Sequence, residues 1–426
     1  MLYTIVKRED MMMKRSAGMI AVMSMVLLGG CFEKQNELHE SMVSCPEKTQ
    51  LISDDFEGKP VCQLRGTYSE DLSLSADKSW ALKGEVHIGV DGGESAVLEI
   101  APGTTIFGKT GADFLVITRG SKIIAEGEVS QPIIFTSMKD AAGLISVPGD
   151  WGGIAIAGNA PTNAGREERF EFSNTDVRFG GEKEDDDSGV LKYVQIRYAG
   201  NEVRPGEELN GLSLGGVGRK TVIDYVAVYN GKDDGIEAWG GNVNMSHLVL
   251  IGNGDDNLDF DHGYRGDVRH VYIEQTVVTS IHARGIETDN NKKDPAALPR
   301  TQAHVSDFEI VGTTESSEGV YSRRGSGLIL SNGIIRDVGG IGIYVKTIDE
   351  SRFEENHFYD VELLDCAKGA VGDRSARITD LYSFNKKYDS SIVESVSEEG
   401  DEMVRSASLV AWRGSQRWRS DWSQIN

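Results

Sequence analysis

The chain consists largely of short apolar runs, rich in β-branched residues, that end at Gly, Asn, Asp or Pro. Residues 97–101, 114–118, 132–136, 153–157 and 191–196 are examples. No stretch with the 3.6-residue period of a helix separates these runs. The pattern therefore predicts an all-β protein made of short strands.

The middle of the chain repeats. Segments 226–237 and 248–259 can be overlaid at an offset of 22 residues, and a small–apolar–polar triplet recurs at 285–287, with looser copies at 319–321 and 342–344. A period of roughly 20–30 residues built from short strands is typical of a solenoid. The 50 glycines among 426 residues supply corners and close contact between rungs.

This repeat predicts a right-handed parallel β-helix over residues 79–373, with alternate apolar side chains stacked inside. A β-propeller is the alternative, disfavoured because propeller blades run to about 40–50 residues. Residues 31–78 are expected to form a tether and an N-terminal cap, and residues 374–426 a C-terminal cap. Solenoids need such caps because an open terminal rung is an unpaired sheet edge.

The N-terminus is typical of an export signal. A basic pair, Lys14–Arg15, precedes the apolar stretch 19–28, which predicts a signal peptide over residues 1–30. Residues 28–31 resemble a bacterial lipobox, which implies that Cys31 becomes the mature N-terminus and carries acyl chains, palmitate among them. Phe32 stands where an inner-membrane retention signal usually has Asp, so the expected location is the outer membrane. An ordinary signal peptide with a chance cysteine is the alternative.

The other cysteines fit an exported protein. Cys45 and Cys62 are close in sequence and are expected to pair, since an oxidising compartment permits disulfides. Cys366 would then remain single. No Cys or His spacing indicates a zinc site.

The charge balance narrows the choice of partners. The formal net charge is −23, and removal of residues 1–30 takes away four basic and two acidic residues, which makes it −25. Nucleic acid is excluded, because phosphate binding needs clustered Lys and Arg. A cation or a basic surface is a better partner for this chain.

Several strings in the chain carry a family resemblance: 80–86, 100–108, 117–127, 132–137, 151–161 and 191–200. Together they resemble a group of exported right-handed β-helix lipoproteins of Gram-negative bacteria. The likeness runs from Trp80 to Tyr272 and weakly to Trp422. It implies the fold and an envelope location, but it brings no settled activity with it, so function has to be argued from sites.

An acidic constellation is the best candidate site. In a parallel solenoid, residues one period apart share a face, so five carboxylates are expected to stack as metal ligands: Asp234, Glu237, Asp256, Asp259 and Glu287. Like charges about 5 Å apart repel, which favours a bound cation. Calcium suits such a set of oxygen ligands. The alternative is that Asp and Asn simply fill turns, where they bond their own backbone.

Catalysis is a second possibility. Lyases of this fold combine acidic calcium ligands, here Asp234 and Asp256, with a basic residue that removes a proton, here Arg284 or Lys346. Hydrolases of the fold use neighbouring aspartates as acid and base. The spacing around His262 does not match the hydrolase pattern. The sequence therefore favours a protein that binds an extended ligand, a polysaccharide or an envelope protein, without cleaving it.

The C-terminal segment carries three tryptophans, Trp412, Trp418 and Trp422. They are expected to belong to the cap. A carbohydrate-binding platform is the alternative, because Trp faces stack on sugar rings. A purely structural role in the cell envelope, with neither cation nor ligand, completes the set of hypotheses.

Overall fold

The computed structural model describes residues 44–170, 172, 177–276, 283–316, 318–346, 356–372 and 381–383. Residues from Cys45 onward form one compact unit, separate from the unit Met1–Ser44. The predictions for the signal peptide, for Cys31 and for Trp412, Trp418 and Trp422 lie outside the described residues.

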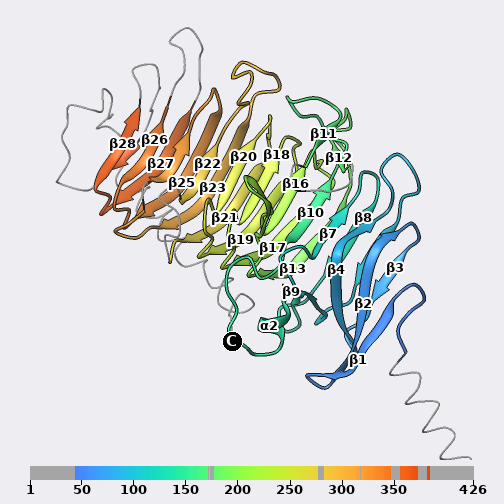
Figure 1. Ribbon diagram of the computed structural model, residues 1–426. Helices are drawn as coiled ribbons and strands as arrows, with labels where there is room; N and C mark the ends of the chain where they lie inside the picture. Colours follow the sequence, from blue (N-terminus) through green and yellow to red (C-terminus); the bar gives the residue numbers. More distant parts are fainter. Residues whose placement is uncertain are drawn as a thin grey trace, which may run out of the picture. The chain divides into compact units, whose positions relative to one another are not determined.

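Three ladders of parallel strands build the compact unit, and Figure 1 shows the strands stacked side by side from β2 to β28. The first ladder contains β2 (Lys59–Tyr68), β4 (Ser79–Ile88), β6 (Thr105–Gly108), β9 (Ile133–Ser137), β13 (Gly189–Arg197), β17 (Val222–Tyr229), β19 (Asn244–Ile251), β21 (Asp267–Glu274), β23 (Gln302–Val311), β25 (Gly327–Arg336), β27 (His357–Leu364) and β29 (Leu381–Ser383).

The second ladder starts from the end of β4 and contains β7 (Phe114–Ile117), β10 (Gly153–Ala157), β16 (Leu212–Gly215), β18 (Ile236–Trp239), β20 (Leu258–Asp261), β22 (Arg284–Thr288), β24 (Glu318–Ser322), β26 (Ile341–Val345) and β28 (Lys368–Gly372). The third contains β3 (Leu72–Leu74), β5 (Val97–Ile100) and β8 (Lys122–Glu126), and continues in the first halves of β13 and the later long strands. The predicted parallel β-helix is confirmed.

The long strands of the first ladder bend at one corner. Tyr193, Tyr225, His247 and His270 interrupt β13, β17, β19 and β21 with φ between 50° and 57°. Such a left-handed backbone is unfavourable for residues with a side chain. Here the rings stack on one another, with centroids 4.5 Å, 4.1 Å and 4.7 Å apart, and this packing offsets the strain. The bend lets one strand serve two faces.

Apolar columns fill the interior of the helix. Ile236, Leu258 and Ile286 follow one another in register on successive rungs, and all three are fully buried. Rungs in a sheet lie about 4.8 Å apart, and glycine permits this spacing where two backbones come close together. A Cβ on Gly285 would lie 2.6 Å from the backbone oxygen of Gly319, so no larger residue fits there without displacing the next rung.

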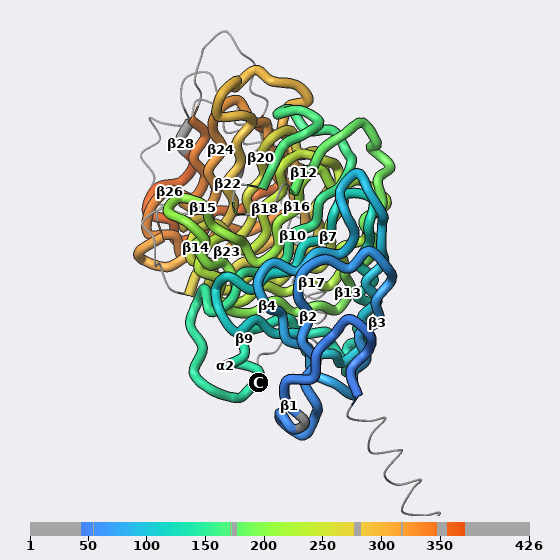
Figure 2. Tube along the Cα trace, turned by 45° about the vertical axis from the view of Figure 1, so that its right-hand side comes forward, coloured from blue at the N-terminus to red at the C-terminus, as the bar shows by residue number. Residues whose placement is uncertain are grey.

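The N-terminal cap closes one end of the helix. β1 (Gln50–Phe56) pairs antiparallel with β2, and the predicted disulfide between Cys45 and Cys62 is confirmed, with Cα atoms 5.6 Å apart. β2 and β3 already stack in parallel on the next rung, so stacking starts within the segment that the sequence assigns to the cap. The short helix α2 (Met138–Ala141) lies beside the cap in Figure 2.

Two small hairpins project from the corners: β11 (Glu168–Arg169) with β12 (Arg178–Phe179), and β14 (Glu202–Arg204) with β15 (Glu207–Glu208). Cys366 is buried and unpaired, as the sequence predicts. No helix within the described residues is both long enough and apolar enough to cross a membrane.

Candidate ligand-binding site on the acidic face

The second ladder carries carboxylates on its outer surface over three consecutive rungs. Alternation along a strand turns the residue after each buried Ile or Leu outward, and register places three such residues side by side: Glu237, Asp259 and Glu287. Together with the carboxylates around them they form a surface that we call the acidic strip: Asp233, Asp234, Glu237, Asp255, Asp256, Asp259, Asp261, Glu287 and Asp289.

Carboxylate oxygens converge at the start of the strip. Asp234, Glu237 and Asp259 each place one ligand atom within 4.8 Å of the other two, and Asp233, Asp234 and Asp255 form a second such group. These distances suit oxygen ligands that share one cation. The Oδ1 atom of Asp259 is buried and has no hydrogen-bond partner among the described residues. An ion at this point would supply the missing interaction.

Part of the carboxylate chemistry is structural. The Asp234 carboxylate accepts a hydrogen bond from the Asp256 backbone N–H at 2.8 Å, which joins two rungs. The Asn210 side chain donates to Glu237 Oε2 at 2.7 Å. One oxygen of Asp234 and one of Glu237 thus have partners within the protein, whereas Oδ1 of Asp259 has none among the described residues.

Burial makes the ionised state of these groups costly. It raises the pKa of Asp234, Glu237, Asp256 and Asp259 well above the ordinary value, and the neighbouring carboxylates add to the effect. The pKa of Asp261 rises to about 8, mainly through burial and then through Asp289. At neutral pH these buried carboxylates therefore favour holding protons or binding a cation.

The pKa of Asp233 is also raised. Burial, followed by the charge of Asp255, raises the pKa of Asp233 to about 8.

The far end of the strip is neutralised by arginine. Arg284, 7% exposed, pairs with Glu287 Oε2 at 2.6 Å, with Glu318 at 3.3 Å and with Asp256 at 3.5 Å. Its guanidinium lies over the Tyr321 ring, with Cζ 4.6 Å from the centroid. A charge this buried persists only when it is paired and hydrogen-bonded.

Two further arginines complete this end. Arg323 pairs with Glu287 and, at 2.9 Å, with Asp289, and Arg324 pairs with the other oxygen of Asp289. The strip thus has two halves: Asp234, Glu237 and Asp259, which have no ion pair among the described residues, and Asp256, Glu287 and Asp289, which pair with arginine.

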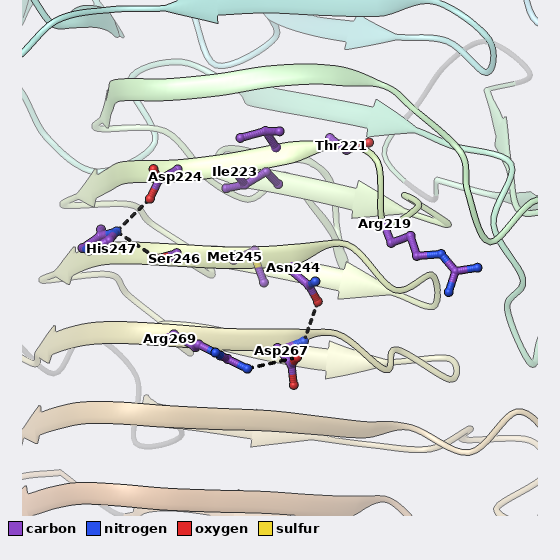
Figure 3. Close-up of a pocket in the computed structure, with 11 residues that line it drawn as sticks. Arg219, Thr221, Ile223, Asp224, Asn244, Met245, Ser246, His247, Asp267 and Arg269 are labelled. Atoms are coloured by element: carbon purple, nitrogen blue, oxygen red, sulfur yellow. Dashed lines mark hydrogen bonds and ion pairs between the residues drawn. The ribbon is translucent and has the colours of Figure 1, made fainter.

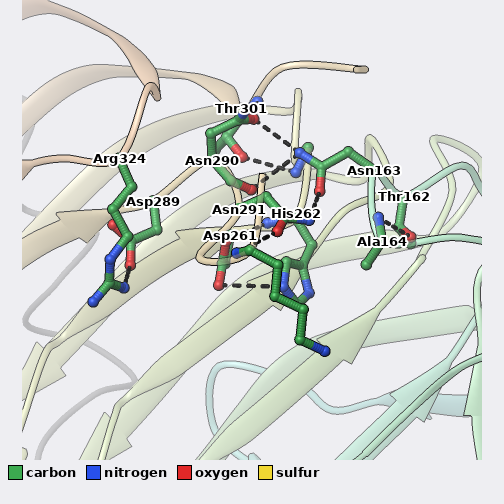
Figure 4. Close-up of polar contacts among 12 residues, drawn as sticks. Thr162, Asn163, Ala164, Asp261, His262, Asp289, Asn290, Asn291, Thr301 and Arg324 are labelled. Atoms are coloured by element: carbon green, nitrogen blue, oxygen red, sulfur yellow. Dashed lines mark hydrogen bonds and ion pairs between the residues drawn. The ribbon is translucent and has the colours of Figure 1, made fainter. Parts of the chain in front are cut away.

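Loops form a polar wall at the carboxyl ends of β20 and β22. Asn163 donates to the side chain of Asn290 at 2.8 Å and accepts from Asn291 at 3.0 Å, so two distant loops are joined, as Figure 4 shows. Next to them lies His262, whose pKa burial lowers to about 4. This histidine is neutral at physiological pH and therefore adds no positive charge to the strip.

The family model of a pectate-lyase-like β-helix domain matches residues 66–422. The chain belongs to this family. A solved alginate lyase from Paenibacillus sp. str. FPU-7 has 15% sequence identity, and the alignment covers 74% of this chain and 96% of that chain with a TM-score of 0.24. No curated protein matches the chain.

This pectate-lyase-like β-helix brings together most of the residues that the sequence singles out. The five predicted metal ligands share the acidic strip, but Asp256 pairs with Arg284 and Glu287 with two arginines, and both stand outside the groups of converging carboxylates. Arg284 serves as a counter-ion in this arrangement. Lys346 is exposed and follows β26, three rungs beyond β20 and so roughly 14 Å along the axis.

Asp261 of the strip and the adjacent Trp239 are absent from the predicted set although the sequence contains the signal for both. Trp239 and Asp261 come two positions after Glu237 and Asp259, so period-2 alternation places them on the same outer face. Trp239 is half-buried and packs edge-on against Phe170, with ring centroids 5.5 Å apart. It gives the strip an aromatic border.

The pectate-lyase-like β-helix also has a groove on the third ladder, of about 510 Å³, whose polar and apolar lining comes mainly from β17, β19 and β21. Figure 3 shows Asp224 bonded to His247, and Asp267 beside Asn244 and Arg269. Acidic and basic groups pair with one another in this groove. The acidic strip is the stronger candidate, because its converging carboxylates Asp234, Glu237 and Asp259 have no ion pair among the described residues.

Proposed function

We propose that the acidic strip binds a divalent cation and, through it, an acidic polysaccharide. The observation that carries the proposal is the group Asp234, Glu237 and Asp259. Their oxygens lie within 4.8 Å of one another, and no ion pair neutralises them among the described residues. The neighbouring acidic residues, one rung further on, form ion pairs with three arginines. The fold thus neutralises one half of the strip and leaves the other half for an ion.

The ligand chemistry favours calcium. Calcium takes six to eight oxygen ligands in flexible geometry, and three carboxylates leave coordination positions open. The carboxylate of a uronate sugar is an oxygen donor that fits those positions. The long regular face of a solenoid suits an extended chain, and membership of a pectate-lyase-like family supports an acidic polysaccharide over a basic envelope protein.

Removing one ligand should weaken the cation site. Asp259→Asn is expected to raise the calcium Kd at least tenfold in isothermal calorimetry, because it removes a charged ligand and changes little in volume. Asp185→Asn is the matched control, since Asp185 is exposed and pairs with Arg219 away from the group. Absence of heat for the unaltered protein, or equal weakening by both variants, would refute the site.

The family membership also favours a second candidate, eliminative cleavage of an acidic polysaccharide. A cation would neutralise the uronate carboxylate and make the adjacent proton more acidic. A base must then remove that proton. The three arginines of the strip are each held in ion pairs, and so binding without cleavage remains the first proposal.

A product assay separates the two candidates. Polygalacturonate and alginate incubated with the protein and calcium are expected to be retained without new unsaturated ends, followed by ultraviolet absorbance. Release of unsaturated ends that is lost in Asp256→Ala would replace the binding proposal with a lyase.

We propose further that the chain is an exported lipoprotein held at the outer membrane through Cys31. The lipobox-like run 28–31 and the resemblance to Gram-negative β-helix lipoproteins support this location. A tethered β-helix would present its acidic strip to envelope or surface polysaccharides.

A further inference from the structure

A loop with an apolar tip projects beside the N-terminal cap. It links α2 to β10, and its residues Leu144, Ile145 and Val147 are 64%, 91% and 51% exposed. We call these three residues the apolar tip. Met138, 36% exposed, lies at its base. Single exposed apolar residues are ordinary, whereas a contiguous group indicates an interaction surface.

The rest of the loop holds the tip in place. Four hydrogen bonds connect the loop to itself and to its surroundings: Leu144 N–H to Lys139 O at 2.8 Å, Ser137 Oγ to Ser146 Oγ at 2.8 Å, Val147 N–H to Asp150 Oδ2 at 2.9 Å and Gly149 N–H to Ala199 O at 3.0 Å. The apolar side chains are therefore displayed by an ordered loop.

The charges at the base of the loop are balanced. Asp150 pairs with Lys139 at 2.6 Å, and Asp140 pairs with Arg197 at 3.4 Å. The protein has a net charge of −23, but the ion pairs at the base of this loop leave no net charge there. The base can approach an anionic surface without the repulsion that the acidic strip would meet.

The tip lies on the part of the molecule where the chain enters. Ala141 of α2 packs against the same apolar cluster as Ile52 and Phe56 of β1, and Cys45 is bonded to β2. Residues 32–44 separate Cys31 from Cys45, and an extended chain of that length spans at most about 45 Å. A bilayer that held Cys31 would therefore lie within about 45 Å of Cys45.

We propose that the apolar tip inserts into the interfacial region of a lipid bilayer. Leu, Ile and Val side chains partition into the headgroup–acyl boundary. The contact would supplement an anchor at Cys31 and orient the β-helix relative to the membrane. The choice of a bilayer as occupant rests on the lipoprotein proposal, whereas cation binding at the acidic strip is independent of it.

Vesicle binding tests the proposal. Residues 45–426 form a compact unit and exclude both the signal peptide and Cys31. With vesicles of phosphatidylethanolamine and phosphatidylglycerol, this unit is expected to co-sediment, and Ile145→Asp is expected to weaken binding at least tenfold. Leu298→Asp is the matched control, since Leu298 is exposed (76%) and outside the tip. Unchanged thermal midpoints will show that the variants are folded.

Other outcomes overturn the proposal. Absence of co-sedimentation, or equal loss in both variants, would exclude the bilayer contact. Self-association that Ile145→Asp abolishes, without vesicle binding, would assign the tip to a second copy of the chain. Palmitate labelling of the full chain tests the anchor separately, so failure of the anchor and failure of the tip can be distinguished.

Discussion

Replacing Arg284 with methionine is expected to lower the free energy of unfolding by about 3–5 kcal/mol, because it removes the counter-ion of buried Asp256 and one of the two counter-ions of buried Glu287. Arg284 pairs with Asp256, Glu287 and Glu318, and both Asp256 and Glu287 are at most 4% exposed. Methionine retains part of the packing of the arginine stem against Tyr321. The loss is therefore expected to be electrostatic.

Urea unfolding and thermal melts of the variant at neutral pH measure this loss. Lys122→Met is the matched control, since Lys122 and its partner Asp187 are 38% and 39% exposed, and an exposed pair contributes at most about 1 kcal/mol. Lowering the pH should reduce the defect of Arg284→Met, because protonated carboxylates need no arginine. A defect no larger than that of Lys122→Met would show that the buried pairs do not stabilise the fold.

The sequence predicts the fold because each rung repeats the same short pattern of apolar and polar residues. Ile236, Leu258 and Ile286 recur with an outward acid after each, and a parallel solenoid is the arrangement that buries all three together. The corner formed by Tyr193 and His247 could not be predicted from the sequence. Residues with aromatic or imidazole side chains rarely adopt a φ above zero. The corner is recognised only from the stacking of these rings on successive rungs of the structure.

The candidate site was predictable in position but not in its division into halves. The 22-residue offset aligns Asp234 with Asp256 and Glu237 with Asp259, which suffices to stack the carboxylates. The offset says nothing of the pairing of Glu287 with arginine. Arg323 comes from the rung after Glu287, and its contact depends on side-chain length and direction across rungs.

Stability without a cation is expected to fall as the pH rises from about 4 to about 8. The pKa values of Asp233 and Asp261 rise from 3.8 to about 8 in the folded protein. Across this window the folded state holds protons that the unfolded chain has released, so each unit of pH costs stability. One unit of pKa shift corresponds to about 1.4 kcal/mol. The stabilisation is complete below pH 4 and lost above pH 8.

Calcium should reverse this trend, because it binds the ionised carboxylates and competes with protons. In chelator-treated protein the thermal midpoint is expected to drop between pH 5 and pH 8. Calcium at 100 times its Kd should restore about 2.7 kcal/mol at pH 8 and far less at pH 5. Asp259→Asn should abolish most of this calcium gain, whereas Asp185→Asn should keep it. A midpoint that rises with pH in the absence of metal, or a calcium effect that is the same at both pH values, would mean that the buried carboxylates of the strip are neutralised in some other way.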